Sequence, residues 1–258
     1  MAQPMTSEQE RQIKRFFEDA LIGLGLTKDQ AQTLITSGGE FQQEVKDLML
    51  AFVTGKQVYK LARAILGNDF ITPEEVAKTR GITYTEEQLR QFSNTLPKVE
   101  VLQWLREHGY MLVPGPANPI ALLDIRVMNA TYFYSKEGGW YANDSEKFSR
   151  DDKAAVKWLA VRKDIVPDST SKTWEEQTVL LSSDEYVPNA GEFAWAITTY
   201  YAVRGIYLFP GLYARTSSVG SDGGRVDLGD FGSSGLRVDY YFDDNRSGDL
   251  GVASARKL

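Results

Sequence analysis

The stretch VPNAGEFAWAITTYYAVRG, from Val187 to Gly205, carries start and stop signals of a helix. Pro188 and Asn189 are typical of the first positions of a helix, and Gly205 is typical of the position that ends one. The residues between them are mostly apolar or small. We therefore expect a buried helix here, with Trp195 as an anchor of the surrounding core.

Short β-like segments surround this helix, and glycine is dense after Gly205, as in strands joined by tight turns. A second helix is expected over residues 149–161. Together these patterns predict a mixed α+β domain with small antiparallel sheets and two helices. The expected strands are residues 110–115, 130–135, 138–142, 206–216, 224–231 and 236–242.

The chain before this domain has a helical pattern from Thr6 to about Gly109. Threonines stand at several helix starts, and Glu follows three positions later or next to the threonine, as in capping boxes. Prolines and Gly115 then mark a turn or linker. The sequence thus predicts a helical domain over 1–109, acting as a spacer or docking module, and a second domain over 110–258.

Composition excludes several chemistries. The chain has no cysteine, so it has no disulfide, thiolate metal site or cysteine nucleophile. Its single histidine, His108, lies at the end of an expected helix and rules out a multi-histidine zinc site. The net charge of -6 argues against a nucleic-acid groove. We expect no catalytic residues and no resident metal.

Two segments resemble known families. Residues 187–205 are similar to a helix of formylglycine-generating-enzyme-like domains, matching at Val187-Pro188, Glu192, Trp195-Ala196 and Arg204-Gly205. The chain from Tyr213 to Leu258 resembles the ending of bacterial C-type-lectin-like domains, with Arg215-Thr216-Ser217-Ser218 and the final GVASARKL as the matching blocks. The resemblance covers roughly residues 110–258.

The resemblance implies a C-type-lectin-like fold. It does not imply formylglycine-generating activity, which uses active-site cysteines. The same fold carries the variable proteins of diversity-generating retroelements, in which adenine mutation rewrites codons near the 3′ end of a gene. Rewritten Asn codons give Asp, Ser, Tyr, Gly and similar residues, and Asp239–Asp249 consists of nearly that set. The resemblance therefore implies a possible diversified recognition surface there.

The C-terminal stretch LRVDYYFDDNRSGDLGVASARKL, Leu236 to Leu258, is expected to form a hairpin, with residues 243–249 as the turn. Tyrosine offers contact area at low entropic cost, and Ser, Gly and Asn adapt their hydrogen bonds. We therefore predict a ligand-binding surface for an unknown protein or glycan, made of Arg237, Asp239, Tyr240, Tyr241, Asp243, Asp244, Asn245, Arg246, Ser247 and Asp249.

Other interpretations remain open at this point. The spacing of Asp243, Asn245, Ser247 and Asp249 matches the first part of an EF-hand loop, so calcium is a possible cofactor, although the expected glutamate is replaced by Ser254. A fixed lectin-like domain in a structural particle or envelope is a second class. An enzyme on the formylglycine-generating-enzyme-like scaffold is a third.

The sequence leaves the compartment open. The first twenty residues are charged and lack an apolar core, so no signal peptide is expected. No run approaches the roughly 18 apolar residues of a membrane span. Cytoplasmic, particle-associated and non-classically exported locations all agree with these features.

Overall fold

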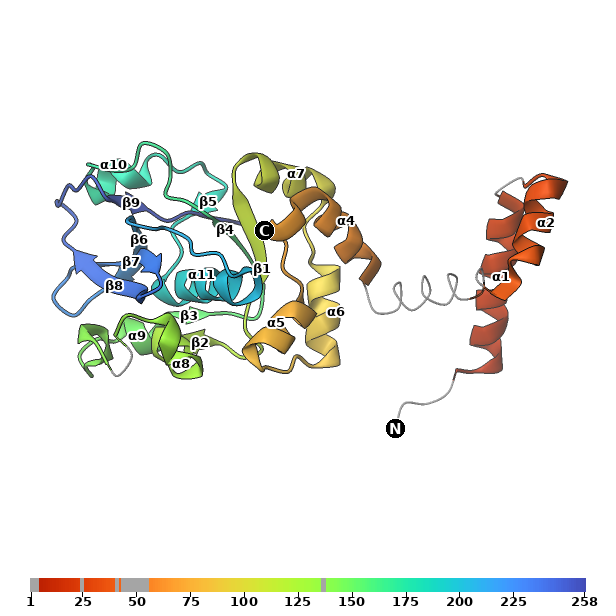
Figure 1. Ribbon diagram of the computed structural model, residues 1–258, viewed down its shortest axis with the longest axis horizontal. Helices are drawn as coiled ribbons and strands as arrows, with labels where there is room; N and C mark the ends of the chain where they lie inside the picture. Colours follow the sequence, from red (N-terminus) through yellow and green to blue (C-terminus); the bar gives the residue numbers. More distant parts are fainter. Residues whose placement is uncertain (1–4, 24–25, 40–41, 43–55, 136–137) are drawn as a thin grey trace. The chain divides into compact units, whose positions relative to one another are not determined.

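The computed structural model describes residues 5–23, 26–39, 42, 56–135 and 138–258 (Figure 1). The chain forms two compact units, Met1–Val53 and Thr54–Leu258. Residues 40–41 and 43–55 of the expected helical pattern lie outside the described residues.

The first unit contains helices α1 (Ser7–Gly23) and α2 (Lys28–Thr36). Thr27 caps the start of α2, as the sequence predicts: its side chain accepts a hydrogen bond from the Gln30 backbone N–H. The Thr27 backbone N–H donates to the Gln30 side-chain oxygen at 2.9 Å, which completes a capping box. None of the residues described in α2 is buried.

The second unit begins with short helices whose starts follow the sequence signals. Thr72 and Thr85 each form a capping box, with Glu75 and Gln88 respectively, and Gly81 follows a helix end with φ of 66°. The elements of this part are α4 (Lys56–Leu66), the 3-10 helix η1 (Gly67–Asp69), α5 (Pro73–Arg80), α6 (Glu86–Asn94) and α7 (Val99–Glu107).

These helices share one hydrophobic core with the rest of the second unit. The Trp158 ring packs edge-on against Phe92 at 5.2 Å, and its indole N–H donates to the Phe92 carbonyl at 2.8 Å. Arg204 pairs with Glu75 at 2.8 Å. The sequence placed a domain boundary after Gly109, whereas the compact units divide after Val53. The helices α4 to α7 pack their apolar faces against the sheets, and they therefore belong to the same unit.

Three small sheets follow. The first has the strand order β1-β4-β10-β5 and is antiparallel throughout; its strands are β1 (Tyr110–Pro114), β4 (Trp158–Arg162), β10 (Ala255–Arg256) and β5 (Glu185–Tyr186). The second pairs β2 (Ile120–Ala121) with β3 (Lys153–Ala154). The third has the order β8-β7-β6-β9; its strands are β6 (Tyr213–Val219), β7 (Arg225–Gly232), β8 (Gly235–Tyr241) and β9 (Leu250–Val252).

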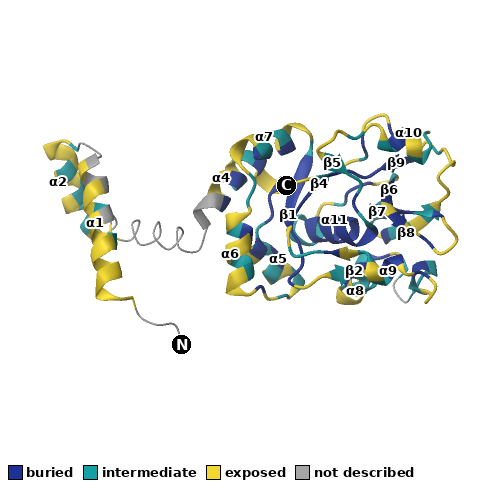
Figure 2. Cartoon of the chain, turned by 180° about the vertical axis from the view of Figure 1, so that it is seen from behind, coloured by how far each residue is buried: buried dark blue, intermediate teal, exposed yellow. Residues whose placement is uncertain are grey.

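Helix α11 (Ala190–Arg204) lies at the centre of this unit, as its sequence predicts. Asn189 caps its start together with Glu192, and Gly205 ends it in the left-handed conformation. Its residues from Ala190 to Tyr200 are all buried, and the helix is dark blue within its surroundings in Figure 2. The remaining helices are α8 (Leu122–Met128), η2 (Ala130–Tyr132), η3 (Trp140–Ala142), α9 (Phe148–Asp151) and α10 (Trp174–Thr178).

The α+β class with N-terminal helices is confirmed, but some local predictions are wrong. The helix expected over 149–161 forms only at its start, in α9, and strands β3 and β4 follow. The run from Trp158 to Val161 is buried because β4 is a central strand. The strands expected at 130–135 and 138–142 are short 3-10 helices instead. In these 3-10 helices Tyr141 is part of the core, and Tyr132 and Trp140 pack against it. The apolar pattern that suggested strands therefore comes from core packing without strand pairing.

Candidate binding surface

The C-terminal hairpin predicted from the sequence is wrong. Strand β8 pairs antiparallel with β7, and β9 pairs parallel with β6 at the opposite edge of the sheet. Residues 242–249 therefore cross from one edge to the other and are called the crossing segment below. The alternation of Leu236–Phe242 correctly predicted a strand, but strand alternation does not specify the pairing partner.

The two faces of β8 carry different side chains, as the sequence predicts. Leu236 is 1% exposed, and the Tyr240 ring packs at 4.7 Å from the Trp140 ring, so this face contacts the core. Asp239 and Tyr241 lie on the other face and are exposed. Tyr240, which was expected to contact a ligand, is thus half-buried on the inner side.

The backbone of the crossing segment is held by groups outside it. Buried Arg215 donates to the carbonyls of Phe242 at 3.0 Å and Asn245 at 2.9 Å. Two backbone amides donate to further carbonyls, Trp174 to Asp243 at 2.8 Å and Ser171 to Ser247 at 2.7 Å. The segment is exposed in its side chains and fixed in its backbone.

Several of the predicted binding residues are already paired within the chain. Asp243 receives two hydrogen bonds from Arg225, at 2.8 and 3.0 Å, and Arg225 lies 3.7 Å over the Trp174 ring. Arg246 pairs with Glu176 at 2.8 Å, and this pair together with the hydrogen bond from the Thr173 backbone N–H lowers the pKa of Glu176 to about 2. These pairs brace the crossing segment against α10.

The other predicted residues divide into paired and exposed groups. Arg237 pairs with Asp230 at 3.0 Å, and the Ser247 hydroxyl donates to the Asp249 carboxylate. Asp244 and Asn245 are exposed, and no side-chain hydrogen bond or ion pair of theirs occurs within the described part of the chain. With Asp239, Tyr241 and the neighbouring Phe242, they form the outward set.

A buried acid that sequence reasoning missed lies beneath this surface. Asp227 on β7 is 0% exposed, and neither of its carboxylate oxygens has a hydrogen-bond partner. Its strand neighbours are Arg215 on one side and Asp239 on the other. Burial raises the pKa of Asp227 well above its usual range, the charge of Asp239 adds to this rise, and Arg215 opposes it. An aspartate within a strand pattern was the available signal.

Replacing Asp227 with asparagine is expected to stabilise the protein at neutral pH. Because the folded-state pKa of Asp227 is raised, its contribution to stability is complete below the unfolded-state pKa and is lost as pH rises through the folded-state value. Each pKa unit of that rise corresponds to about 1.4 kcal/mol. Urea unfolding of both proteins over a range of pH measures the difference, which should grow with pH. A difference that is constant with pH would contradict this account.

The EF-hand-like spacing does not produce a metal-binding arrangement within the described residues. No group of three or more His, Cys, Asp or Glu side chains suited to a metal ion occurs there. The Asp243 carboxylate is directed to Arg225, and no helix lies immediately before the crossing segment. Of the two acids in this spacing, Asp243 pairs with Arg225 of the same chain and Asp249 accepts from the Ser247 hydroxyl.

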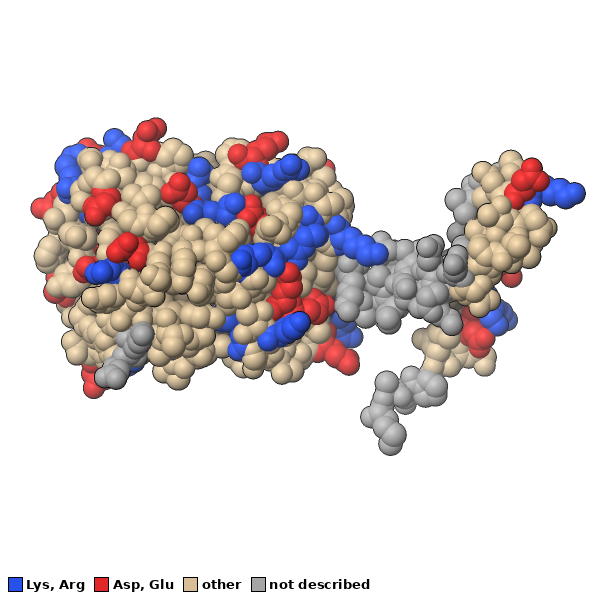
Figure 3. Space-filling model, in the orientation of Figure 1, with Lys and Arg blue, Asp and Glu red and all other residues tan. Residues whose placement is uncertain are grey.

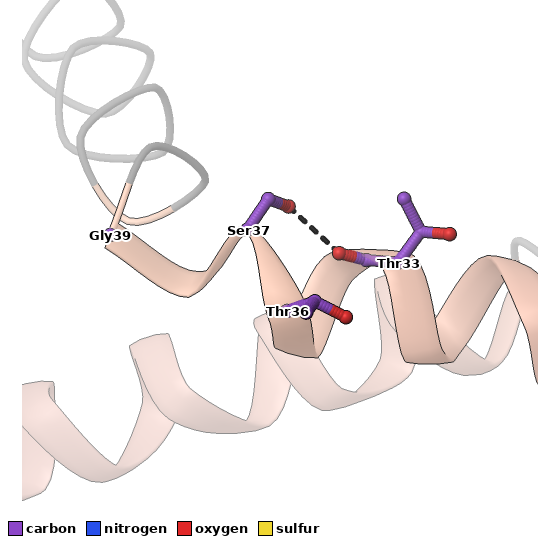
Figure 4. A pocket seen from close by; sticks show the side chains of 4 residues that line it. All are labelled: Thr33, Thr36, Ser37 and Gly39. Atoms are coloured by element: carbon purple, nitrogen blue, oxygen red, sulfur yellow. Dashed lines mark hydrogen bonds between the residues drawn. The ribbon is translucent and has the colours of Figure 1, made fainter.

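Pockets also lie elsewhere in the described part of the chain. In the second unit, a groove of about 600 Å³ is lined by Gln91, Thr95, Lys157, Trp158, Tyr186, Arg256, Lys257 and Leu258. Its cations have partners, since Lys157 pairs with Glu192 at 2.9 Å and Arg256 with Asp184 at 3.1 Å. In the first unit, the pocket in Figure 4 is lined by Thr33, Thr36, Ser37 and Gly39.

The pocket of the first unit has little chemistry in its described lining. The Ser37 hydroxyl donates to the Thr33 carbonyl at 2.9 Å, and the Thr36 hydroxyl donates to the Gln32 carbonyl at 2.5 Å (Figure 4 shows the first of these bonds). Both hydroxyl protons thus serve the helix that carries them. The outward set is the stronger candidate.

On the face shown in Figure 3, basic and acidic side chains are interspersed over the second unit. Among the described helices, none has the length and apolar character needed to cross a membrane. The chain matches no family model, no curated protein and no solved structure.

Proposed function

We propose that the protein is a non-enzymatic ligand-binding protein whose recognition surface is the outward set: Asp239, Tyr241, Phe242, Asp244 and Asn245. The observation that carries this proposal is the fixed backbone beneath exposed side chains. Arg215 is fully buried and donates to two carbonyls of the crossing segment. A rigid scaffold that presents exposed aromatic, acidic and amide side chains is a common arrangement in recognition proteins.

The aromatic members support recognition over a simple solvated turn. Phe242 is 49% exposed and Tyr241 is 36% exposed, on neighbouring positions at the end of β8. Exposed large aromatic side chains have a cost in water that contact with a ligand removes. Acidic and amide groups beside them would supply directional hydrogen bonds.

We also propose that residues 110–258 form a C-type-lectin-like domain and that a retroelement diversifies its outward residues. A C-type-lectin-like scaffold of a retroelement variable protein would combine fixed anchors with changeable outward residues. The anchors Arg215, Trp174 and Ser171 precede the crossing segment in sequence, and they hold it mainly through its main-chain carbonyls. Changes of the outward side chains would therefore leave most of the anchoring bonds in place. The N-terminal helices would serve as a spacer or as a docking module for a further partner.

DNA sequencing around the gene tests diversification. We expect a near-copy of the codons for residues 225–258 beside a reverse-transcriptase gene, differing only where the copy has adenines. The structure sharpens this expectation, because the differences should affect the outward set and spare inward positions such as Val226, Leu228 and Leu236. Absence of a copy, or differences spread equally over inward codons, would reject diversification.

A further inference from the structure

Acidic side chains meet on the face of the β6–β9 sheet that also carries Arg215, and none of them forms an ion pair within the described residues. Asp227 and Asp239 are direct partners across strands β7 and β8. Like charges that face each other across strands destabilise a sheet. Asp249 adds to the negative field at Asp227 from the end of the crossing segment. Asp227 and Asp239 are called the acidic pair below.

The nearby arginines have other partners. Arg215 donates to four oxygen acceptors, those of Lys172 and Gln177 and the two carbonyls of the crossing segment. Arg225 pairs with Asp243 and Arg237 pairs with Asp230. In the described part of the chain, no ion pair within 4.0 Å involves either member of the acidic pair.

The acidic pair differs from an ordinary solvated cluster of acids because Asp227 is fully buried and both its oxygens lack a hydrogen-bond partner. Burying an unpaired carboxylate opposes folding. On the exposed side, the Asp239 carboxylate accepts only the backbone N–H of the adjacent Tyr240, at 2.9 Å, among the described residues. An external cation would supply the missing partner.

We propose that the outward set recognises a basic side chain of a protein ligand, which pairs with Asp239 above Asp227 and packs against Tyr241. This inference rests on the proposed binding function and names its ligand chemistry. Tyr241 and Asp239 lie on the same face of β8, two positions apart, so one flat guanidinium can contact a carboxylate and an aromatic ring together. Arginine fits this site better than lysine because its planar group binds a carboxylate through two parallel hydrogen bonds.

A titration followed by amide NMR of the full chain tests the proposal. The probe is the capped tripeptide Gly-Arg-Gly, and the matched control is the same peptide with citrulline, which is nearly the same shape as arginine and carries no charge. We expect the arginine peptide to shift the signals of Asp239 and Tyr241, and the citrulline peptide to leave them nearly unchanged. The variant D239N should weaken binding by about tenfold, the loss expected when one charged hydrogen-bond partner is removed.

The variant E107Q supplies the control for net charge. Glu107 is an exposed acid on α7, and α7 and β8 lie at opposite ends of the second unit (Figure 1). Binding by E107Q should equal that of the unaltered protein. Equal shifts with arginine and citrulline peptides, equal losses in D239N and E107Q, or no shift on β8 would each overturn the proposal.

The outcomes separate this inference from the proposed function. If the gene carries the adenine-marked copy and the arginine peptide fails to bind, a diversified binding surface stands and the basic ligand is rejected. If the peptide binds in the expected way and no copy exists, the basic-side-chain site stands on a fixed surface. Binding of a neutral glycan in place of the peptide would support the surface and reject the cation.

Discussion

Arg215→Ala is expected to destabilise the protein by about 3–5 kcal/mol, the range for breaking a buried, hydrogen-bonded charge network. The Arg215 guanidinium is 0% exposed and donates to four acceptors, of which two belong to the crossing segment. Its removal would leave the Asn245 carbonyl without a donor and the Phe242 carbonyl with only the Asn245 backbone N–H. It would also remove the positive charge that limits the rise in the pKa of Asp227.

Arg215→Ala should loosen the crossing segment before it unfolds the whole second unit. Hydrogen exchange should accelerate first at the Asn245 amide, which donates to the Phe242 carbonyl at 3.1 Å within the crossing segment. Urea unfolding gives the total loss of free energy. The conservative variant Arg215→Lys keeps the charge but lacks the fork of donors, so it should recover only part of the stability.

Tyr241→Ser is the matched control for Arg215→Ala. Tyr241 is on the outward face of β8 and its replacement should change the free energy of unfolding by no more than about 0.5 kcal/mol, as for ordinary surface positions. A large loss with Tyr241→Ser would make that side chain part of the core. A small loss with Arg215→Ala would show that the crossing segment does not depend on this anchor.

The sequence correctly predicted features that depend on neighbouring residues, such as helix caps and the alternating faces of a strand. The caps at Thr27 and Thr72 are formed as expected, because a capping box involves residues only three positions apart, and Asn189 stands at the start of its helix as predicted. The alternation in residues 236–242 likewise places Asp239 and Tyr241 outward. The helix caps and the alternation of strand faces both depend only on residues a few positions apart in the chain.

Features that depend on register could not be predicted in the same way. The unusual environment of Asp227 depends on the pairing of β7 with β6 and β8, which places Arg215 on one side of it and Asp239 on the other. The role of Arg215 depends on carbonyls 27 and 30 residues away in the chain. The run at Trp158–Val161 satisfies both a buried helix and a central strand, and only its place between β1 and β10 decides between them.

Trp195→Ala is expected to cost about 3–5 kcal/mol, the usual range for removing a large buried aromatic side chain. Trp195 is 0% exposed in the middle of α11, and its indole N–H donates to the Pro114 carbonyl at the end of β1 at 2.9 Å. The change would leave a cavity and a carbonyl without its donor. Both losses would act at the junction of α11 with the first sheet.

The same ring also faces α5. The guanidinium of Arg80 lies 4.8 Å from the Trp195 ring centre, and burial lowers the pKa of Arg80 to about 10. Two of the Arg80 nitrogens lack a hydrogen-bond partner, so the ring face is an important source of compensation for this buried cation. Trp195→Phe keeps a ring face and loses the indole donor, and it should therefore be less destabilising than Trp195→Ala.

Thermal and urea unfolding of both Trp195 variants distinguish the contributions of the ring and the indole donor. If the ring clamps α5 to α11, hydrogen exchange in α5 should accelerate in Trp195→Ala and much less in Trp195→Phe, because only the alanine variant exposes the buried Arg80 to an empty site. Equal acceleration in both variants would assign the effect to the indole bond with Pro114. A neutral Trp195→Ala would contradict the placement of this residue at the centre of the core that joins the α4–α7 helices to the sheets.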